Sequence, residues 1–451
     1  MKSKDKKSLT RLPTRPLERN LRLARLGLSS GTQIAAHSLA NLFRGKQAQR
    51  ESDRAFYLEQ AHALADELGR LKGSVMKAGQ MLSLYGQYFL PEEAVQALSS
   101  LQDDTPAVEW SVLAPLLEHA LGRSRLRELE VDPAPLAAAS LGQVHRARRK
   151  KDGLELCVKI RYPGVAEAIE SDVRTLQRLV TMTRMAPQGL DLAPVFDEVR
   201  EMLHRETDYG AERRFTEDFG QRLMGDRRYV VPRVIAEYCS DIVLTTTFES
   251  GLHVRDAMVQ ALPQTRRNAL GAAALELFLM EFFCWGQVQT DPHFGNYRIR
   301  LGGEGSDPLV LLDFGATRVF GRGFIEGYAQ IVRGAMNHDR TAVSTGARAI
   351  GLTQAGFPDA ALDGFAELCQ LIVEPFATDT VYDWGGSDLP QRTAASIARN
   401  ALSRHFRLPP REIVFLHRRL AGVFILLATL RVQLDARSRL LQHLDETMAR
   451  N

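Results

Sequence analysis

The spacing of apolar residues predicts a helix between Tyr57 and Tyr88. Leucines and one valine recur there at intervals of three, four and seven residues and form a core-facing stripe of Leu64, Leu68, Leu71, Val75 and Leu82. The opposite side of this helix carries Gly69, Gly73, Lys77 and Gln80. A glycine destabilises a helix by about 1 kcal/mol relative to alanine, so two of them on one face indicate that another segment packs closely there. The alternative is that Lys77 lies on an ordinary solvated face.

The middle of the chain shows strand and helix patterns in turn. Leu154 to Ile160 alternates like a strand after a Lys-Lys-Asp-Gly turn, which predicts a β-hairpin that carries Lys159. A lysine in a strand is more often a solvated edge residue. Residues 196–223 predict one long helix or two abutting helices, and two short strands are expected within residues 230–248. Further helices are predicted at residues 91–101, 110–122, 265–283, 324–336, 342–349, 359–373 and 410–443.

The candidate chemistry lies between Gln289 and Thr317. Asp291 and Asn296 stand five residues apart (296 − 291), which is the spacing of the D-x-x-x-x-N catalytic loop of protein-kinase-like folds. Asp313 opens an Asp-Phe-Gly at the end of an apolar run. In such folds the first Asp positions or deprotonates the attacking hydroxyl, while the Asn and the second Asp hold Mg²⁺ against the nucleotide phosphates. Asp-Phe-Gly alone is more often a simple turn, but the preceding loop favours the kinase-like interpretation.

Residues upstream fit the same interpretation. A kinase-like fold needs a strand lysine for the phosphates and a helix glutamate to orient it, and Lys159 is the candidate lysine. Glu206 and Glu212 are six residues apart (212 − 206), too far to share one partner on one helical face, so each could serve a different lysine. Two solvent-facing carboxylates are the alternative. Residues 136–145 stand where a Gly-rich phosphate loop is expected, yet Gly142 is their only glycine, and the start of an ordinary helix is the alternative there.

Composition limits the remaining possibilities. The chain has 451 residues, 45% hydrophobic and 25% charged, an ordinary globular composition with room for two or three core-bearing units. Its four cysteines lie far apart without a C-x-x-C pair, which argues against a disulfide framework or a zinc site and favours a reducing compartment. We find no secretory signal and no uncharged apolar run of 18 residues, so we expect a soluble or peripheral protein.

The first 50 residues are strongly basic. They carry twelve Lys or Arg against Asp5 and Glu18, a net charge of +10 in a chain whose total is +4. Leucines interleave with these arginines as in an interfacial amphipathic segment. We therefore expect an anionic membrane surface as the partner of this leader and no nucleic acid, because nucleic-acid arms more often carry aromatic groups. A basic leader without a partner is the alternative.

Four stretches together resemble the UbiB (AarF) family of atypical kinase-like proteins, which is associated with ubiquinone biosynthesis. Residues 71–83 resemble the family's K-x-G-Q helix, and residues 137–144 resemble its Ala-rich replacement of the Gly-rich loop. Residues 206–208 resemble its E-x-D motif, and residues 291–296 with residues 313–315 are similar to its active-site loops. The similarity runs in the right order from about residue 55 to the C-terminus.

The resemblance implies a role for each matching residue. Lys159 would bind the nucleotide phosphates with Glu212 as its helix partner, and Asp291 would be the third catalytic residue. Asn296 and Asp313 would hold Mg²⁺, and ATP or ADP would be the nucleotide. Nucleotide contacts would come from Ala137, Ala138, Ala139, Ser140, Gly142, Gln143 and Val144. Regulatory contacts would come from Lys77, Gln80, Glu206 and Asp208, with Lys77 crossing to Glu206.

The chain departs from the family pattern at three points. Gln289 stands where many members have His, and Phe294 stands where Pro is common. The paired transmembrane helices found at the C-terminus of many bacterial members are missing. We therefore expect a cytoplasmic protein that associates peripherally with the inner membrane face.

We predict an α+β, bilobal protein-kinase-like fold with an N-terminal helical extension packed over the active site. Its expected parts are a basic leader (residues 1–50), the helical extension (51–124), a kinase-like N-lobe with inserted helices (125–250) and a helical C-lobe (251–451). The expected function is an Mg²⁺-dependent ATPase or small-molecule kinase in isoprenoid-quinone or membrane-lipid metabolism. Its expected partners are a quinone precursor or lipid and proteins of quinone biosynthesis. A true protein kinase is the alternative enzyme, disfavoured by the lack of a long activation segment, and a nucleotide-binding scaffold without turnover is the alternative of another class.

Overall fold

The structure is a computed structural model that describes residues 74–86, 95, 107–139, 141–182, 192–303, 306–353, 358–401 and 409–449. The chain divides into two compact units. The N-terminal unit comprises Met1–Arg214 and Arg233–Phe248, and the C-terminal unit comprises Phe215–Pro232 and Glu249–Asn451. The basic leader, the glycines at 69 and 73, most of the helix predicted at residues 91–101, and Ser140 lie outside the described residues.

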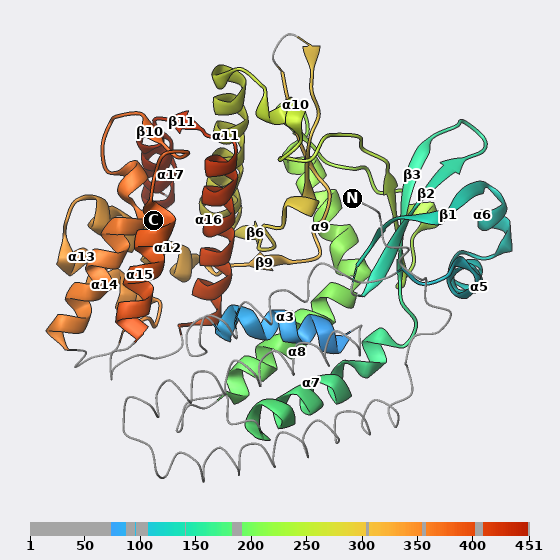
Figure 1. Cartoon of the computed structure of the whole chain (residues 1–451), viewed down its shortest axis with the longest axis horizontal. Coiled ribbons are helices and arrows are strands. Elements are labelled where there is room, and N and C mark those ends of the chain that lie inside the picture. Colours follow the sequence, from blue (N-terminus) through green and yellow to red (C-terminus); the bar gives the residue numbers. More distant parts are fainter. Residues whose placement is uncertain are drawn as a thin grey trace. The chain divides into compact units, whose positions relative to one another are not determined.

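A four-stranded antiparallel sheet in the order β1-β2-β3-β5 is the centre of the N-terminal unit (Figure 1). Its strands are β1 (Leu129–Ala138), β2 (Gly142–Arg149), β3 (Glu155–Arg161) and β5 (Val243–Thr247). The predicted hairpin is confirmed, because β2 and β3 pair around the Lys-Lys-Asp-Gly turn. Leu156, Val158 and Ile160 are fully buried, so the alternation of β3 places Lys159 on the opposite face from these three residues.

The N-terminal unit also contains α-helices. They are α3 (Ser74–Gly86), α5 (Trp110–Leu121), α6 (Arg123–Arg127), α7 (Val165–Met182) and α8 (Ala193–Thr207), followed by the first residues of α9 (Tyr209–Arg222). Helix α3 packs against both α7 and α8, which also contact each other (Figure 1). Ala78 and Leu82 of α3 are fully buried. The helix predicted between Tyr57 and Tyr88 is therefore confirmed over Ser74–Gly86.

The long helical pattern at residues 196–223 is two abutting helices, one of the two predicted possibilities. Helix α8 ends at Thr207, and α9 begins at Tyr209. Asp208 separates them, and its Oδ1 atom accepts a 2.8 Å hydrogen bond from the backbone N–H of Ala211. Such a bond satisfies one of the unpaired N–H groups at a helix start, so Asp208 fixes where α9 begins. Glu206 and Glu212 consequently lie on different helices.

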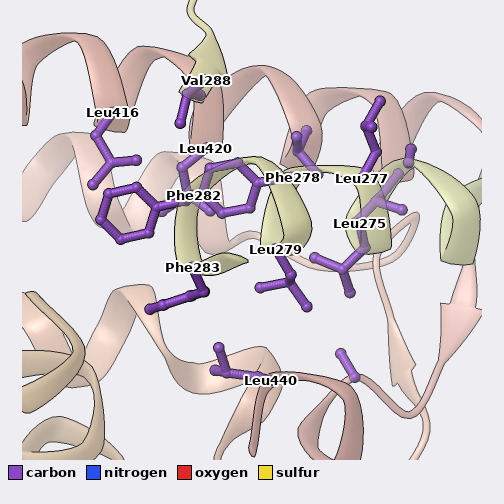
Figure 2. Close-up of a cluster of buried hydrophobic side chains, with 14 of the residues drawn as sticks. Leu275, Leu277, Phe278, Leu279, Phe282, Phe283, Val288, Leu416, Leu420 and Leu440 are labelled. Atoms are coloured by element: carbon purple, nitrogen blue, oxygen red, sulfur yellow. The ribbon is translucent and has the colours of Figure 1, made fainter. Parts of the chain in front are cut away.

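The core of the C-terminal unit surrounds α11 (Gln264–Leu279) and the π-helix η3 that continues it (Met280–Trp285). Figure 2 shows Phe278, Phe282 and Phe283 of this segment among leucines of α16 (Arg411–Thr429) and α17 (Arg437–Ala449). Phe282 and Leu416 are fully buried. By length and composition, Gln264–Trp285 is also the one described helix that could cross a membrane, but 61% of its most apolar window is buried in this core.

Short strands carry the predicted catalytic loops. Strand β8 (Leu309–Leu311) lies between β4 (Tyr229–Val230), which is parallel to it, and β7 (Tyr297–Ile299), which is antiparallel. Strand β6 (Gln287–Gln289) pairs with β9 (Thr317–Val319). The other described α-helices and strands of this unit are α10 (Ala257–Gln260), α12 (Arg322–Met336), α13 (Arg340–Ala349), α14 (Asp359–Ile372), α15 (Leu389–Ala401), β10 (Tyr382–Asp383) and β11 (Gln433–Leu434).

The continuous helix predicted for residues 410–443 is wrong. Helix α16 ends at Thr429, and the chain turns through Arg431, whose φ is 51°, into β11 before α17 begins. A non-glycine residue in the left-handed region is costly, so surrounding contacts must hold it there. The backbone N–H of Val432 donates a hydrogen bond to the carbonyl of Leu427, and β11 pairs with β10. These contacts stabilise the turn.

Candidate nucleotide and metal site

Lys159 and Glu212 form the first candidate pair, within the N-terminal unit. The Lys159 Nζ atom donates hydrogen bonds to both carboxylate oxygens of Glu212, at 2.6 and 2.8 Å. The Glu212 side chain is 4% exposed and the Lys159 side chain is 23% exposed. The ammonium also lies 5.2 Å from the centre of the Tyr209 ring. A glutamate one turn into α9 thus holds a strand lysine, which is the arrangement that kinase-like folds use to bind phosphates.

Lys77 and Glu206 form a second pair in the same unit. The Lys77 Nζ atom lies 2.8 Å from Oε1 of Glu206, and the two side chains are 18% and 21% exposed. Helix α3 is thereby joined to the last turn of α8, and the predicted crossing from Lys77 to Glu206 is present. Gln80 lies one turn further along α3 and is partly buried. Asp208 caps the start of α9, and its regulatory assignment stays a prediction.

The Ala-rich segment is the end of the β1–β2 hairpin rather than the start of a helix. Ala137 pairs with Val144 and Ala138 pairs with Gln143, and the methyl groups of Ala137, Ala138 and Ala139 are exposed. A side chain at Gly142 would collide with the Tyr209 hydroxyl, since an added Cβ would lie 2.4 Å from it. The same Cβ would lie 2.8 Å from the backbone carbonyl oxygen of Ile160, which cannot move aside as a side chain can, so this position requires glycine.

Gln143, which is predicted to contact nucleotide, has a side chain that bonds within the protein. Gln143 is fully buried. Its Oε1 atom accepts hydrogen bonds from the Val108 backbone N–H at 2.9 Å and from the Tyr162 hydroxyl at 3.1 Å. Its Nε2 atom donates to the Val108 carbonyl at 3.2 Å. The amide is occupied in joining β2 to the segment before α5, so at this position only the main chain is left for a nucleotide.

Asn296 and Asp313 are brought together in the C-terminal unit by the β7–β8 pairing. Asn296 precedes β7 by one residue, and Asp313 follows β8 by two, so both lie at the same end of an antiparallel pair. The backbone N–H of Leu312 donates a 2.9 Å hydrogen bond to the carbonyl of Asn296. Asp313 accepts a 2.9 Å bond from the backbone N–H of Gly315. We call Asp291, Asn296 and Asp313 the carboxylate site.

Asp291 is held by donors on both of its carboxylate oxygens. Asn296 Nδ2 donates to Oδ2 and to the backbone carbonyl of Asp291, each at 3.1 Å. Arg418 of α16 donates to Oδ1 at 2.6 Å. Arg418 is not among the predicted site residues, because it belongs to no motif and lies 127 residues beyond Asp291. The available signal was a pair of consecutive arginines inside an otherwise apolar helix.

Helix α16 supports the catalytic loop at two further points. Arg419 pairs with Glu281 of η3 at 3.0 Å and bonds to the Tyr297 hydroxyl, and both charged side chains are buried. Burial raises the pKa of the Glu281 carboxyl, while the Arg419 charge opposes that shift. At Gly422, an added Cβ would lie 1.9 Å from Cβ of Pro292, the residue after Asp291. The loop therefore rests directly on the backbone of α16.

The two departures in the loop have local explanations. Gln289 is buried, and its Oε1 atom accepts a 3.1 Å hydrogen bond from the backbone N–H of Asp291. An acceptor is the only feature that this bond requires, and glutamine supplies it. Phe294 is partly buried, and its ring lies beside His253 and 5.3 Å from the Arg255 guanidinium carbon. An aromatic ring at this position thus joins the loop to the segment before α10.

The fold and these groups define a protein-kinase-like protein of an atypical class. It has a strand lysine paired with a helix glutamate, a D-x-x-x-x-N loop and an Asp-Phe-Gly. The sequence profile of the ABC1 atypical kinase-like domain matches residues 100–346. The chain belongs to this family, and the predicted UbiB relationship is confirmed.

Several curated proteins are similar over most of the chain. Atypical kinase COQ8B, mitochondrial, of Rattus norvegicus is 32% identical over 415 residues, which cover 91% of this chain and 76% of that protein. Atypical kinase COQ8, mitochondrial, of Saccharomyces cerevisiae is 28% identical over 94% of this chain and 84% of that protein. Atypical kinase coq-8, mitochondrial, of Caenorhabditis elegans is 32% identical, but the match covers only 51% of that longer protein.

A solved structure is also similar. It is the complex of Rv3197 with erythromycin from Mycobacterium tuberculosis, with a TM-score of 0.58 and 26% sequence identity. The similarity covers 82% of this chain and 92% of that chain. The predicted kinase-like α+β fold is therefore confirmed. Helix α16 lies beyond the residues that the ABC1 profile matches, and its contact with Asp291 is seen in the structure.

Proposed function

We propose that the chain is an Mg²⁺-dependent, ATP-using enzyme, an atypical kinase or ATPase that supports isoprenoid-quinone biosynthesis at a membrane. The observation that carries this proposal is the completeness of the two sets of groups that phosphoryl transfer requires. The N-terminal unit has the Lys159–Glu212 pair, and the C-terminal unit has the carboxylate site. A nucleotide-binding scaffold would not need Asp291, whose carboxylate does not belong to the metal-ligand pair.

The Lys159–Glu212 pair is suited to bind the α- and β-phosphates. A lysine ammonium is a compact point charge with three donors, and the phosphates would share it with Glu212. Because Glu212 is buried and Lys159 is partly exposed, the glutamate fixes the lysine while the ammonium keeps an accessible side. The exposed methyl groups of the Ala-rich hairpin would narrow the space for the phosphates. The alanines would also make this hairpin stiffer than a Gly-rich loop.

The donor set of the carboxylate site fits Mg²⁺. Both hydrogen bonds of Asn296 Nδ2 go to Asp291, which orients the amide so that its oxygen remains for a cation. Asp313 is partly exposed and adds a carboxylate. Mg²⁺ is usually bound by one or two carboxylates together with substrate phosphates and water, so these two residues are sufficient. When bound, the cation would neutralise charge on the phosphates.

Asp291 would orient the attacking hydroxyl or water. Both of its oxygens already accept hydrogen bonds from cationic or amide donors, which favours positioning over strong base catalysis. A loose phosphoryl-transfer transition state needs little covalent assistance, so positioning is the larger contribution. Arg418 is a positioning residue, because it acts through Asp291.

The pathway and the membrane setting are inferred from the relatives and from the leader. The COQ8 proteins are named mitochondrial atypical kinases, and the sequence shared with them covers most of this chain. We infer that a quinone precursor or related lipid is the phosphoryl acceptor or the allosteric ligand. The basic residues of the leader would attach the protein peripherally to an anionic membrane, at roughly 1 kcal/mol per basic residue near the surface.

Phosphate release from ATP tests the proposal. Purified full-length protein is assayed with Mg²⁺, with and without anionic vesicles that contain a quinone precursor. We expect Asp291→Asn and Asp313→Asn to abolish turnover. Asp339→Asn should retain it, because Asp339 only caps α13 through the Ala342 N–H and an amide oxygen can do the same. Wild-type turnover that is absent, or equal in all four proteins, would contradict the proposal.

A further inference from the structure

A cysteine, a histidine and a glutamate are aligned in the C-terminal unit, apart from the carboxylate site. The Sγ atom of Cys284, in η3, lies 3.3 Å from Nδ1 of His443 on α17. On the other side of the imidazole, Nε2 donates a 3.0 Å hydrogen bond to Oε1 of Glu276 on α11. His443 is buried, whereas Cys284 is partly exposed. A sulfur, a base and an orienting carboxylate in this order are the groups that activate a cysteine nucleophile.

The charges around the imidazole favour its protonated form. Burial lowers the pKa of His443, but its hydrogen bonds to Cys284 and Glu276 outweigh burial and raise the pKa to about 9. Glu276 also accepts a 3.4 Å bond from Arg439, and its pKa is lowered, first by the hydrogen bond from His443. The exposed Glu446 brings a second carboxylate oxygen within 4.8 Å of the sulfur and the ring. At neutral pH a cationic N–H therefore points at the Cys284 sulfur.

We propose that Cys284 is a modification site, a thiol that His443 activates towards peroxides and other small electrophiles. A cationic imidazole beside a partly exposed sulfur is the surrounding in which cysteines react. With hydrogen peroxide, the Cys284 thiolate, which has already given its proton to solvent, attacks one oxygen, the O–O bond breaks, and the Nδ1 proton of His443 converts the leaving hydroxide to water. The sulfur is oxidised to a sulfenic acid while the peroxide is reduced. His443 then recovers its proton from solvent.

The position of Cys284 connects this thiol to the catalytic loop. Asp291 follows it by only seven positions (291 − 284), and the six residues between them include the whole of β6. Glu281 of the same π-helix holds Arg419. An oxygen added to the sulfur would replace the contact with His443 and loosen α17 from η3. We therefore expect modification to lower the stability of this unit and to slow turnover.

The test compares cysteines within one native protein. Full-length protein in EDTA at pH 7 is pulsed with iodoacetamide, and the alkylation rate of each cysteine is read by peptide mass spectrometry. Cys239 is the internal control, because it is also partly exposed and its sulfur bonds to the main chain of Ile235 and Thr245. We expect Cys284 to react at least tenfold faster than Cys239. After brief exposure to peroxide, a dimedone trap for sulfenic acid should label Cys284 first.

Two variants separate activation from simple exposure. His443→Gln should slow alkylation of Cys284 about tenfold, and Glu276→Gln should slow it by a smaller factor, while the rate at Cys239 stays unchanged. Equal rates at Cys284 and Cys239 in the wild-type protein would overturn the proposal without any variant. An unchanged Cys284 rate in either variant, with its melting temperature showing that it folds, would overturn it as well. The alkylation assay contains no nucleotide, so its result does not depend on the proposed ATP-using function.

Discussion

Gly422 of α16 gives the sharpest single-atom perturbation of the catalytic loop. In Gly422→Ala, the new Cβ would lie 1.9 Å from Cβ and 2.7 Å from Cγ of Pro292. Non-bonded carbon atoms prefer about 3.5–4.0 Å, so the two segments must separate by roughly 1.5–2 Å. The proline ring is rigid and cannot rotate away. The displacement therefore reaches Asp291, which is bonded covalently to Pro292.

The expected effect on stability is smaller than the effect on activity. Overpacking costs about 1–3 kcal/mol, and the better helix propensity of alanine offsets up to about 1 kcal/mol of that cost. A misplacement of about 1 Å in a catalytic group can lower the rate roughly a hundredfold. We therefore expect Gly422→Ala to fold, to melt a few degrees lower, and to lose most of its Mg²⁺-dependent ATP turnover.

Phosphate release and calorimetric melting measure the two effects separately. Gly323→Ala is the matched control, because an added Cβ at this exposed position of α12 would meet nothing within 4 Å. That control should keep wild-type turnover and an equal or slightly higher melting temperature. If Gly422→Ala keeps turnover within twofold of the wild type, the loop does not depend on its contact with α16, and the reasoning is refuted.

Three further changes test other parts of the account. In a double-mutant cycle of Lys77→Ala and Glu206→Ala, we expect a coupling energy of about 1–2 kcal/mol in denaturant unfolding, which lies between the values for exposed and buried pairs. Additive effects of the two substitutions on the free energy of unfolding would show that Lys77 and Glu206 are unrelated surface charges. Arg418→Gln should lower kcat at least tenfold with little change in the KM for ATP, because it acts through Asp291, and an altered KM alone would assign it to nucleotide binding. The raised pKa of His443 stabilises the fold fully below about pH 6.5, and this contribution is lost as pH rises through 9. The free energy of unfolding of His443→Gln, measured by chemical denaturation, should therefore lack up to about 3 kcal/mol of that pH dependence. An equal pH dependence in both proteins would contradict the raised pKa.

The residue pairs of the N-terminal unit were predicted from the family resemblance, and one local signal agreed with them. The six-residue gap between Glu206 and Glu212 excluded a shared partner, and the structure gives each glutamate its own lysine. Helix periodicity and the hairpin turn likewise depend on neighbouring residues. Gln143 was not predictable from its motif, because its partners at Val108 and Tyr162 are brought to it only by the folded chain.

The support of the catalytic loop could not be predicted, because it comes from residues far away in the sequence. Arg418 carries no spacing signal that points to Asp291, and Gly422 is one small residue in an apolar helix. The end of α16 was missed for another reason. Arg431 adopts the left-handed conformation that glycine usually takes at the end of a helix, so the turn has no glycine or proline that would predict it from the sequence. Contacts with Leu427 and β10 decide it.

The central claim is that Asn296 and Asp313 hold a cation against nucleotide phosphates. Thermal unfolding with ATP alone, Mg²⁺ alone and both together tests it most directly. A ligand at a hundredfold excess over its Kd stabilises the folded state by about 2.7 kcal/mol. We expect the combined shift in the melting temperature of the wild-type protein to exceed the sum of the separate shifts. Asp313→Asn should remove this excess, while Asp339→Asn should keep it. An equal excess in wild type and Asp313→Asn would contradict the assignment of Asp313 as a metal ligand.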